Sequence, residues 1–204
     1  MFITLDGIDG VGKSTQIKQL LGYFEEIGEE TLLVRDPGTT RIGGKLRELL
    51  LESDLELHRR TEAMLFMASR CEMVETILLP AIADGKTVIS DRFLLANVVY
   101  QSVGGVVQPD LLWKMGRLAN GGLIPDLTIL LDMPAQRSME RLGNEKDRME
   151  SRGVDYMEEV RQAFLQQLPH SSDNTLVINA DQSPEDVSRE MLAKVKEILA
   201  ERRA

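Results

Sequence analysis

The chain has 204 residues, which suits one domain because domains average about 150 residues. It carries 24 basic and 33 acidic side chains, so its formal net charge is −9 at pH 7. A surface that binds nucleic acid needs basic residues to meet the phosphates, and this balance argues against one. The single cysteine, Cys71, excludes a disulfide framework and any zinc site that needs two thiolates.

The hydrophobic segments are too short for a membrane helix. A helix that crosses a bilayer needs about 20 consecutive apolar residues, and the longest apolar runs here are far shorter. The first six residues, Met1–Asp6, contain no basic region and no apolar stretch typical of a signal peptide. We therefore expect a soluble, cytoplasmic, globular protein with one domain over residues 1–204 and no role at a membrane.

Short apolar runs alternate with longer amphipathic segments along the chain. The run Phe2–Leu5 predicts a strand, and the helix predicted after it carries the apolar face Ile17, Leu20, Leu21, Phe24 and Ile27. A second strand is predicted at 31–34, followed by a long helix over 59–83 that Pro80 should end or kink. Further strands are predicted at 87–90, 127–131 and 175–179, and further helices at about 109–120, 134–142, 155–168 and 184–202.

Strands that are apolar on both faces and alternate with helices predict a parallel sheet covered by helices. We therefore expect an α/β protein with three layers. In such folds, ligands bind beyond the carboxyl ends of the strands. The segments that directly follow each strand are thus the places to look for functional residues.

The segment after the first strand predicts a phosphate-binding loop. Gly7–Ser14 fits G-x-x-x-x-G-K-[ST] and lies between a strand and an amphipathic helix. The glycines let the backbone curl so that its N–H groups converge on phosphate oxygens, and the helix dipole adds to the attraction. We expect Lys13 to reach the β- and γ-phosphates and the Ser14 hydroxyl to ligate Mg²⁺. The predicted ATP-binding residues are Gly7, Ile8, Asp9, Gly10, Val11, Gly12, Lys13, Ser14 and Thr15.

Several classes of protein use such a loop. A switch GTPase needs an Asn-Lys-x-Asp motif, and the nearest segment, Asn144–Asp147, has the wrong order. A motor or translocating ATPase has acidic residues at the end of a strand, which Asp132 could supply, although it would usually be larger. A nucleotide-binding switch or regulatory ATPase, which would hydrolyse ATP slowly without an acceptor and depend on a protein partner, is a further alternative. The third class is a small kinase that passes the γ-phosphoryl group to another small molecule.

Two residue pairs favour the kinase. Asp91 and Arg92 follow a strand, where a carboxylate can organise Mg²⁺ and a guanidinium can clamp an acceptor phosphate; the alternative is a structural ion pair. Phe66 and Arg70 lie four residues apart and share a helical face. There a ring can stack on a planar base and a guanidinium can bind its carbonyl oxygens; the alternative is a core phenylalanine with a solvated arginine.

A basic segment over about 137–153 also favours the kinase. In this acidic protein it could form a mobile lid that stabilises the transition-state charge and excludes water, so that hydrolysis does not compete with transfer. The alternative is a solvated loop, because acidic residues are interleaved with the basic ones. The basic residues are Arg137, Arg141, Lys146, Arg148 and Arg152.

Taken together and in this order, the motifs resemble those of bacterial thymidylate kinases, which are P-loop nucleoside monophosphate kinases. The resemblance covers nearly the whole chain. It rests on Gly7–Ser14, Arg35–Gly38, Leu65–Arg70, Asp91–Phe93, Tyr100–Gln101, Pro125–Asp132 and Asp147–Glu150. It implies a P-loop NTPase-type fold with a five-stranded parallel sheet and helices on both faces, and a homodimer. It also implies Mg²⁺ as cofactor and transfer of the γ-phosphoryl group of MgATP to thymidine monophosphate (dTMP), giving dTDP and ADP in dTTP synthesis.

The resemblance also assigns roles to residues. Phe66 would stack on thymine, Arg70 would hydrogen-bond its carbonyl edge, and Arg92 would grip the monophosphate. Tyr100 would leave little room for a ribose 2′-hydroxyl. The implied substrate-binding residues are Asp36, Arg47, Phe66, Arg70, Arg92, Asn97, Tyr100 and Gln101, the catalytic residues are Lys13, Arg92, Arg141, Arg148 and Asp9, and the metal ligands are Ser14 and Asp91.

Two features of the chain refine this resemblance. The phosphate-binding loop has Val11 and no arginine, so the catalytic arginine is expected in the lid. Where the family usually has Glu, Gly, Ser and Gly, this chain has Asp36, Thr39, Ala96 and Ser102. These differences fall around the acceptor, so a kinase of another small acceptor, such as a deoxynucleoside or a different nucleotide, is the second hypothesis.

Overall fold

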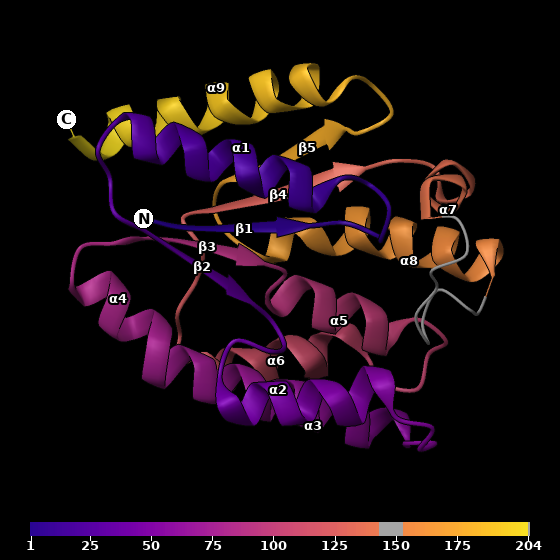
Figure 1. Ribbon diagram of the computed structural model, residues 1–204. Helices are drawn as coiled ribbons and strands as arrows, with labels where there is room; N and C mark the ends of the chain where they lie inside the picture. Colours follow the sequence, from indigo (N-terminus) through magenta and orange to yellow (C-terminus); the bar gives the residue numbers. More distant parts are fainter. Residues whose placement is uncertain (143–152, 204) are drawn as a thin grey trace.

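The computed structural model describes residues 1–142 and 153–203. Its strands form one five-stranded sheet in the order β2–β3–β1–β4–β5, with every neighbouring pair parallel (Figure 1). The strands are β1 (Phe2–Asp6), β2 (Thr31–Arg35), β3 (Thr87–Asp91), β4 (Leu127–Asp132) and β5 (Thr175–Asn179). Each predicted strand is present, and the predicted parallel sheet is confirmed.

Helices cover both faces of the sheet, as Figure 1 shows. One face is covered by α1 (Lys13–Glu26) and α9 (Pro184–Arg203). The other face is covered by α4 (Leu79–Ala83), α5 (Leu94–Ser102), α6 (Pro109–Ala119) and α8 (Val154–Gln167). α3 (Arg59–Met73) packs against α5 and α6, and α2 (Arg41–Arg47) packs against α3. α7 (Ala135–Leu142) lies at the carboxyl end of the sheet. The predicted three-layer α/β fold is therefore confirmed. In the described ranges, no helix combines the length and apolar character needed to cross a membrane.

Two helices of the structure are missing from the sequence predictions. Every residue of α5 from Leu94 to Gln101 is buried, so this helix has no solvent-exposed polar face of the kind that marks an amphipathic helix in a sequence. α2 contains Gly43 and Gly44, which are poor helix formers. Both helices line the carboxyl edge of the sheet, where the functional residues were expected.

The long helix predicted over 59–83 is interrupted as expected, by a change in its hydrogen bonding. α3 ends at Met73, the segment Val74–Leu78 forms a π-helical turn, and α4 begins at Leu79. Pro80, the second residue of α4, has no backbone N–H to donate to the preceding turn. The wider turn just before Pro80 accommodates this missing donor.

β1 ends in a carboxylate that is buried inside the protein. Asp6 is 0% exposed, and neither of its oxygens has a hydrogen-bond partner among the described residues. On the same face of β1, the Thr4 hydroxyl donates to the Thr128 hydroxyl at 3.3 Å. Burial raises the pKa of Asp6 to about 7, although the positive charges of Arg92 and Lys13 act in the opposite direction.

The buried carboxylate predicts a pH-dependent stability that Asp6→Asn should remove. From pH 5 to pH 7 the folded protein holds a proton on Asp6, whereas the unfolded chain, with its ordinary pKa of 3.8, does not. The contribution of Asp6 to the free energy of unfolding therefore falls as the pH rises towards 7. The free energy of unfolding of the variant minus that of the wild type should rise by about 3 kcal/mol from pH 5 to pH 8.

Urea unfolding at several pH values measures this difference. The exposed Asp173 provides a control, since Asp173→Asn should leave the profile parallel to that of the wild type. Parallel profiles for Asp6→Asn and the wild type would contradict the raised pKa.

Candidate active site

The phosphate-binding loop joins β1 to α1 at the carboxyl edge of the sheet. Gly10 and Gly12 have φ values of 82° and 97°, in the left-handed region that glycine adopts without a steric penalty. A Cβ atom on Gly10 would lie 2.3 Å from the carbonyl oxygen of Ser138, so the loop packs directly against α7. The first N–H groups of α1 have no carbonyl partners within the helix, and an anion can bind them.

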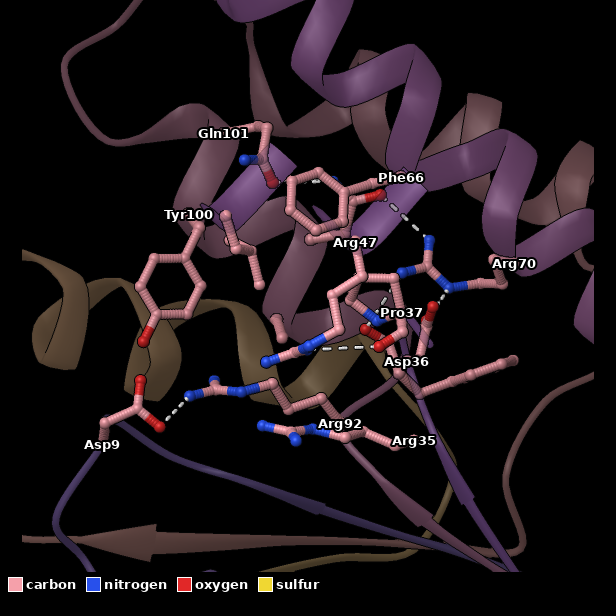
Figure 2. Close-up of a pocket in the computed structure, with 14 residues that line it drawn as sticks. Asp9, Arg35, Asp36, Pro37, Arg47, Phe66, Arg70, Arg92, Tyr100 and Gln101 are labelled. Carbon is pink, nitrogen blue, oxygen red and sulfur yellow. Dashed lines mark hydrogen bonds and ion pairs between the residues drawn. The ribbon is translucent and has the colours of Figure 1, made fainter. Parts of the chain in front are cut away.

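Asp9 lies between two cations in this loop. Lys13 Nζ donates to the carbonyl oxygens of Gly7 (3.1 Å) and Ile8 (2.9 Å) and to Asp9 Oδ1 (3.2 Å). Arg92 Nη2 donates to the same Asp9 oxygen at 2.7 Å, as Figure 2 shows. Burial favours the neutral acid, but the charges of Arg92 and Lys13 hold the pKa of Asp9 well below its usual range. The ionised carboxylate therefore holds both cations together.

Arg92 occupies an unusual backbone conformation. Its φ is 68°, in the left-handed region that costs a residue with a side chain about 1–2 kcal/mol. The Ser90 hydroxyl donates to its carbonyl oxygen at 2.5 Å, and its guanidinium carbon lies 5.2 Å from the centre of the Tyr100 ring. These contacts fix the side chain on the side of the phosphate-binding loop.

The structure separates Asp91 from its neighbour Arg92. Arg92 pairs with Asp9, whereas Asp91 Oδ2 lies 3.7 Å from Nε of Arg35 at the end of β2. The other oxygen of Asp91 is buried and has no hydrogen-bond partner among the described residues. Arg92 is thus paired with the phosphate-binding loop, and Asp91 with the end of β2.

A pocket of about 620 Å³, its open mouth included, lies beside the phosphate-binding loop (Figure 2). It brings together every residue that the sequence resemblance assigned to substrate binding. The lining residues are Asp9, Arg35, Asp36, Pro37, Arg47, Leu51, Phe66, Arg70, Arg92, Phe93, Ala96, Asn97, Tyr100 and Gln101.

One end of the pocket is aromatic and polar. Phe66 of α3 is half-buried there, and Arg70, one turn later, is only 1% exposed. Arg70 Nε donates to Asp36 Oδ2 at 2.6 Å, and its Cζ lies 5.5 Å from the centre of the Phe93 ring. Arg70 is thus a buried, paired cation and not the solvated arginine considered as an alternative.

The other end of the pocket is cationic. Arg35, Arg47 and Arg92 line it, and Figure 2 shows their guanidinium groups on the side of Asp9. Arg47 Nη1 donates to the carbonyl oxygen of Pro37 at 3.2 Å. The pocket therefore offers a place for a planar ring and, at the opposite end, positive charge for a phosphate.

Five lining residues were not among the predicted site residues: Arg35, Pro37, Leu51, Phe93 and Ala96. Arg35 ends β2, just as Asp91 ends the neighbouring β3, and the two are paired in the strand register. The rule that ligands bind at the carboxyl ends of strands could therefore have found it. Pro37 and Phe93 lie within the motifs that carry the resemblance, but no pattern in the sequence distinguishes Leu51.

The described part of the predicted lid lies away from this pocket. Arg141 of α7 donates to the carbonyl oxygen of Ala180 at 3.3 Å and lies 3.5 Å from Asp181. Arg137 pairs with the same Asp181 carboxylate at 3.5 Å. Residues 143–152, including Arg148, lie outside the described residues.

The base of α7 is fastened to β4 and α8 by a charged network. Both oxygens of Asp132 accept hydrogen bonds from Arg161, at 2.7 and 2.8 Å. Arg161 also donates to Glu158 at 2.8 Å, and Glu158 accepts from the backbone N–H of Ala135 at 3.1 Å. Asp132, the residue that a motor or translocating ATPase would use, thus accepts two hydrogen bonds from Arg161.

Comparison with known proteins places the chain in a family. The sequence model of the thymidylate kinase family matches residues 5–191. The thymidylate kinase of Rhodopirellula baltica is 64% identical over 191 residues, which cover 94% of this chain and 78% of that protein. Those of Neisseria gonorrhoeae (39% over 196 residues, 95% of each chain) and Fervidobacterium nodosum (38% over 193 residues, 94% of this chain and 96% of that protein) are also similar. The chain therefore belongs to the thymidylate kinase family.

Proposed function

We propose that this chain transfers the γ-phosphoryl group of ATP to dTMP, giving dTDP and ADP in dTTP synthesis. The observation that carries the proposal is a pocket with a ring-binding end and a cationic end that opens beside the phosphate-binding loop. Asp9 belongs to both the loop and the pocket lining. An acceptor phosphate bound among the arginines thus lies next to the donor site.

The acceptor binds along the pocket with its base against Phe66. Arg70 faces the carbonyl edge of the base, and Arg47 and Arg92 hold the monophosphate. Tyr100 packs against Arg92 and closes the side of the pocket near the sugar. The remaining residues proposed for the acceptor are Asp9, Asp36, Asn97 and Gln101.

The donor triphosphate binds the loop from Gly7 to Thr15. An oxygen of the acceptor phosphate attacks the γ-phosphorus, and the bond to the β,γ-bridging oxygen breaks, leaving ADP. The attacking oxygen is already an anion, so no strong general base is needed. Catalysis then consists of alignment and charge stabilisation by Lys13 and Arg92, both held at the loop by Asp9.

Mg²⁺ is the proposed cofactor, held by the Ser14 hydroxyl and the Asp91 carboxylate. The partnerless Asp91 oxygen at this sheet edge and the exposed Ser14 at the start of α1 fit an ion that prefers oxygen ligands. In the described part of the chain, no three or more His, Cys, Asp or Glu side chains gather into a metal site. A Mg²⁺ ion that takes its remaining ligands from the substrate phosphates fits this donor set, and it would neutralise part of the phosphate charge.

Arg141 and Arg148 are the proposed cations of a lid over about 137–153, in a protein with one catalytic domain. We also propose that the enzyme is a cytoplasmic homodimer. These assignments rest on the resemblance to the thymidylate kinase family.

A coupled assay of ADP release with MgATP and a panel of monophosphates tests the proposed function. ADP should form rapidly with dTMP, more slowly with dUMP, and at background with AMP and GMP. Removal of Mg²⁺ with EDTA should abolish the reaction, and added Mg²⁺ should restore it. ADP release that does not depend on any acceptor would instead support an ATPase, and preference for a different acceptor would support the second kinase hypothesis.

Lys13→Met tests the phosphate-binding loop. It should lower kcat at least about 100-fold, because it removes a positive charge placed where negative charge develops in the transition state. Steady-state kinetics measure the effect, and Lys18→Met on the exposed face of α1 is the matched control that should keep normal turnover. A Lys13→Met enzyme with wild-type kcat would contradict the proposed role of the loop.

A further inference from the structure

The phosphate-binding loop rests on the backbone of the segment that joins β4 to α7. At the start of the loop, a Cβ atom on Gly7 would lie 2.5 Å from the carbonyl oxygen of Leu131. Three residues later, a Cβ atom on Gly10 would lie 2.3 Å from the carbonyl oxygen of Ser138. Backbone thus meets backbone at both points, with no side chain between them that could adjust its rotamer. We call residues 131–138, which carry both carbonyl groups, the β4–α7 corner.

The two contacts lie on different elements. Leu131 belongs to β4, whereas Ser138 lies one turn into α7. Between them the chain changes from strand to helix over Met133 and Pro134. The hydrogen bonds within a sheet or within a helix cannot fix the angle between the two elements. The shape of the surface under the loop therefore depends on the side chains that hold the corner.

Arg161 of α8 holds both sides of the corner. Its guanidinium donates to both oxygens of Asp132, the last residue of β4, at 2.7 and 2.8 Å. It also donates at 2.8 Å to Glu158, whose other oxygen accepts from the backbone N–H of Ala135 at 3.1 Å. Ala135 is the first residue of α7, which packs against α8 (Figure 1). One planar guanidinium thus connects the end of the strand to the start of the helix.

Glu158 meets the start of α7 as an anion. Burial favours its neutral form, but hydrogen bonds from Gln162, Ala135 and Arg161 lower the pKa of this carboxyl group. A negative charge at the N-terminus of a helix is stabilised by the helix dipole. Removal of Arg161 would therefore take away the cation that orients Glu158 as well as the one that holds Asp132.

We propose that Arg161 is a positioning residue for the donor triphosphate, because it fixes the corner against which the phosphate-binding loop rests. The inference rests on the proposed function, since the loop must bind ATP for its position to matter. Arg161 lies outside the lining of the acceptor pocket. α8 approaches that pocket through a different residue, Phe164, whose ring centre lies 5.8 Å from that of Tyr100. Loss of Arg161 should therefore weaken the binding of the donor and not that of the acceptor.

Arg161→Met tests the proposal, since methionine keeps an apolar side chain but cannot donate a hydrogen bond. Calorimetric titration with Mg²⁺ and the non-hydrolysable ATP analogue AMP-PNP, and separately with dTMP, measures the two affinities without turnover. The Kd of AMP-PNP should rise about 10-fold and that of dTMP less than about 2-fold, since a small displacement of a positioned group costs up to about 100-fold. In steady-state kinetics, kcat/KM for ATP should fall by a factor similar to the rise in Kd.

Two further variants of arginine residues show what the effect requires. Arg202 pairs with Asp126, which directly precedes β4 at the end of the strand opposite to the loop. Arg202→Met thus removes the same kind of ion pair beside the same strand, and it should keep both affinities. Arg161→Lys keeps the charge but not the fork that spans Asp132 and Glu158, so it should restore only part of the affinity for AMP-PNP.

Asp132→Asn tests whether the two sides of the corner act together. The substitution removes the charge that Arg161 holds, so it should also weaken AMP-PNP binding selectively. Residues that act as one unit have non-additive effects. The double variant Asp132→Asn/Arg161→Met should therefore bind AMP-PNP no more weakly than Arg161→Met alone. Effects of the two substitutions that multiply would contradict a shared corner.

Thermal unfolding shows which variants are folded, and Asp132→Asn decides the question should Arg161→Met fail to fold. A folded Arg161→Met enzyme with the wild-type Kd for AMP-PNP overturns the proposal. Equal weakening of AMP-PNP and dTMP overturns it too, because the substitution would then only loosen the fold. A wild-type enzyme that binds AMP-PNP but does not phosphorylate dTMP overturns the proposed function alone, since the binding results for Arg161 would still stand.

Discussion

The shared carboxylate of Asp9 is the contact on which the arrangement of the site depends. One of its oxygens accepts from Lys13 at the start of α1 and from Arg92 after β3, at 3.2 and 2.7 Å. Both cations also donate to the carbonyl oxygen of Gly7, so they lie close together. Without the carboxylate between them, they would repel one another. They approach because β1 and β3 are neighbours in the sheet, with Leu5 in register with Asp91. The sheet order therefore joins the phosphate-binding loop to the acceptor pocket.

The same edge of the sheet also positions α7. The loop packs against α7 at Gly10, and α7 is fastened at its first residue by Glu158. Glu158 and Asp132 are in turn held by Arg161 of α8. A change in the position of α8 would thus move α7 and Arg141, and with them the surface against which the loop rests. The phosphate-binding loop, the start of α7 and the pocket are thus linked around the ends of β1, β3 and β4.

The sequence was sufficient to predict the sheet and to choose residues that line one pocket, but not to predict their partners. Apolar runs located every strand, and the residues that the resemblance assigned to the acceptor line one pocket. Periodicity missed α5 because burial on all sides erases the amphipathic pattern. Partners such as Asp9 for Arg92 lie 83 residues apart in the chain, so only the strand order brings them together. The hydrogen bonds of Arg161 and Glu158 could not be predicted for the same reason, since they join β4, α7 and α8.

The buried ion pair at the ring-binding end of the pocket is explained by the hydrogen-bond directions that it imposes, and not by a gain in the stability of the fold. A buried ion pair such as Asp36 with Arg70 often contributes little net stability, because desolvation offsets the Coulomb attraction. Apolar side chains of similar volume could fill the same space, but they could not impose a direction on Asn97 and Gln101. An arginine can, because it never accepts a hydrogen bond. Arg70, held by Asp36, therefore fixes which atom Asn97 turns towards it, and Asn97 in turn fixes the orientation of Gln101.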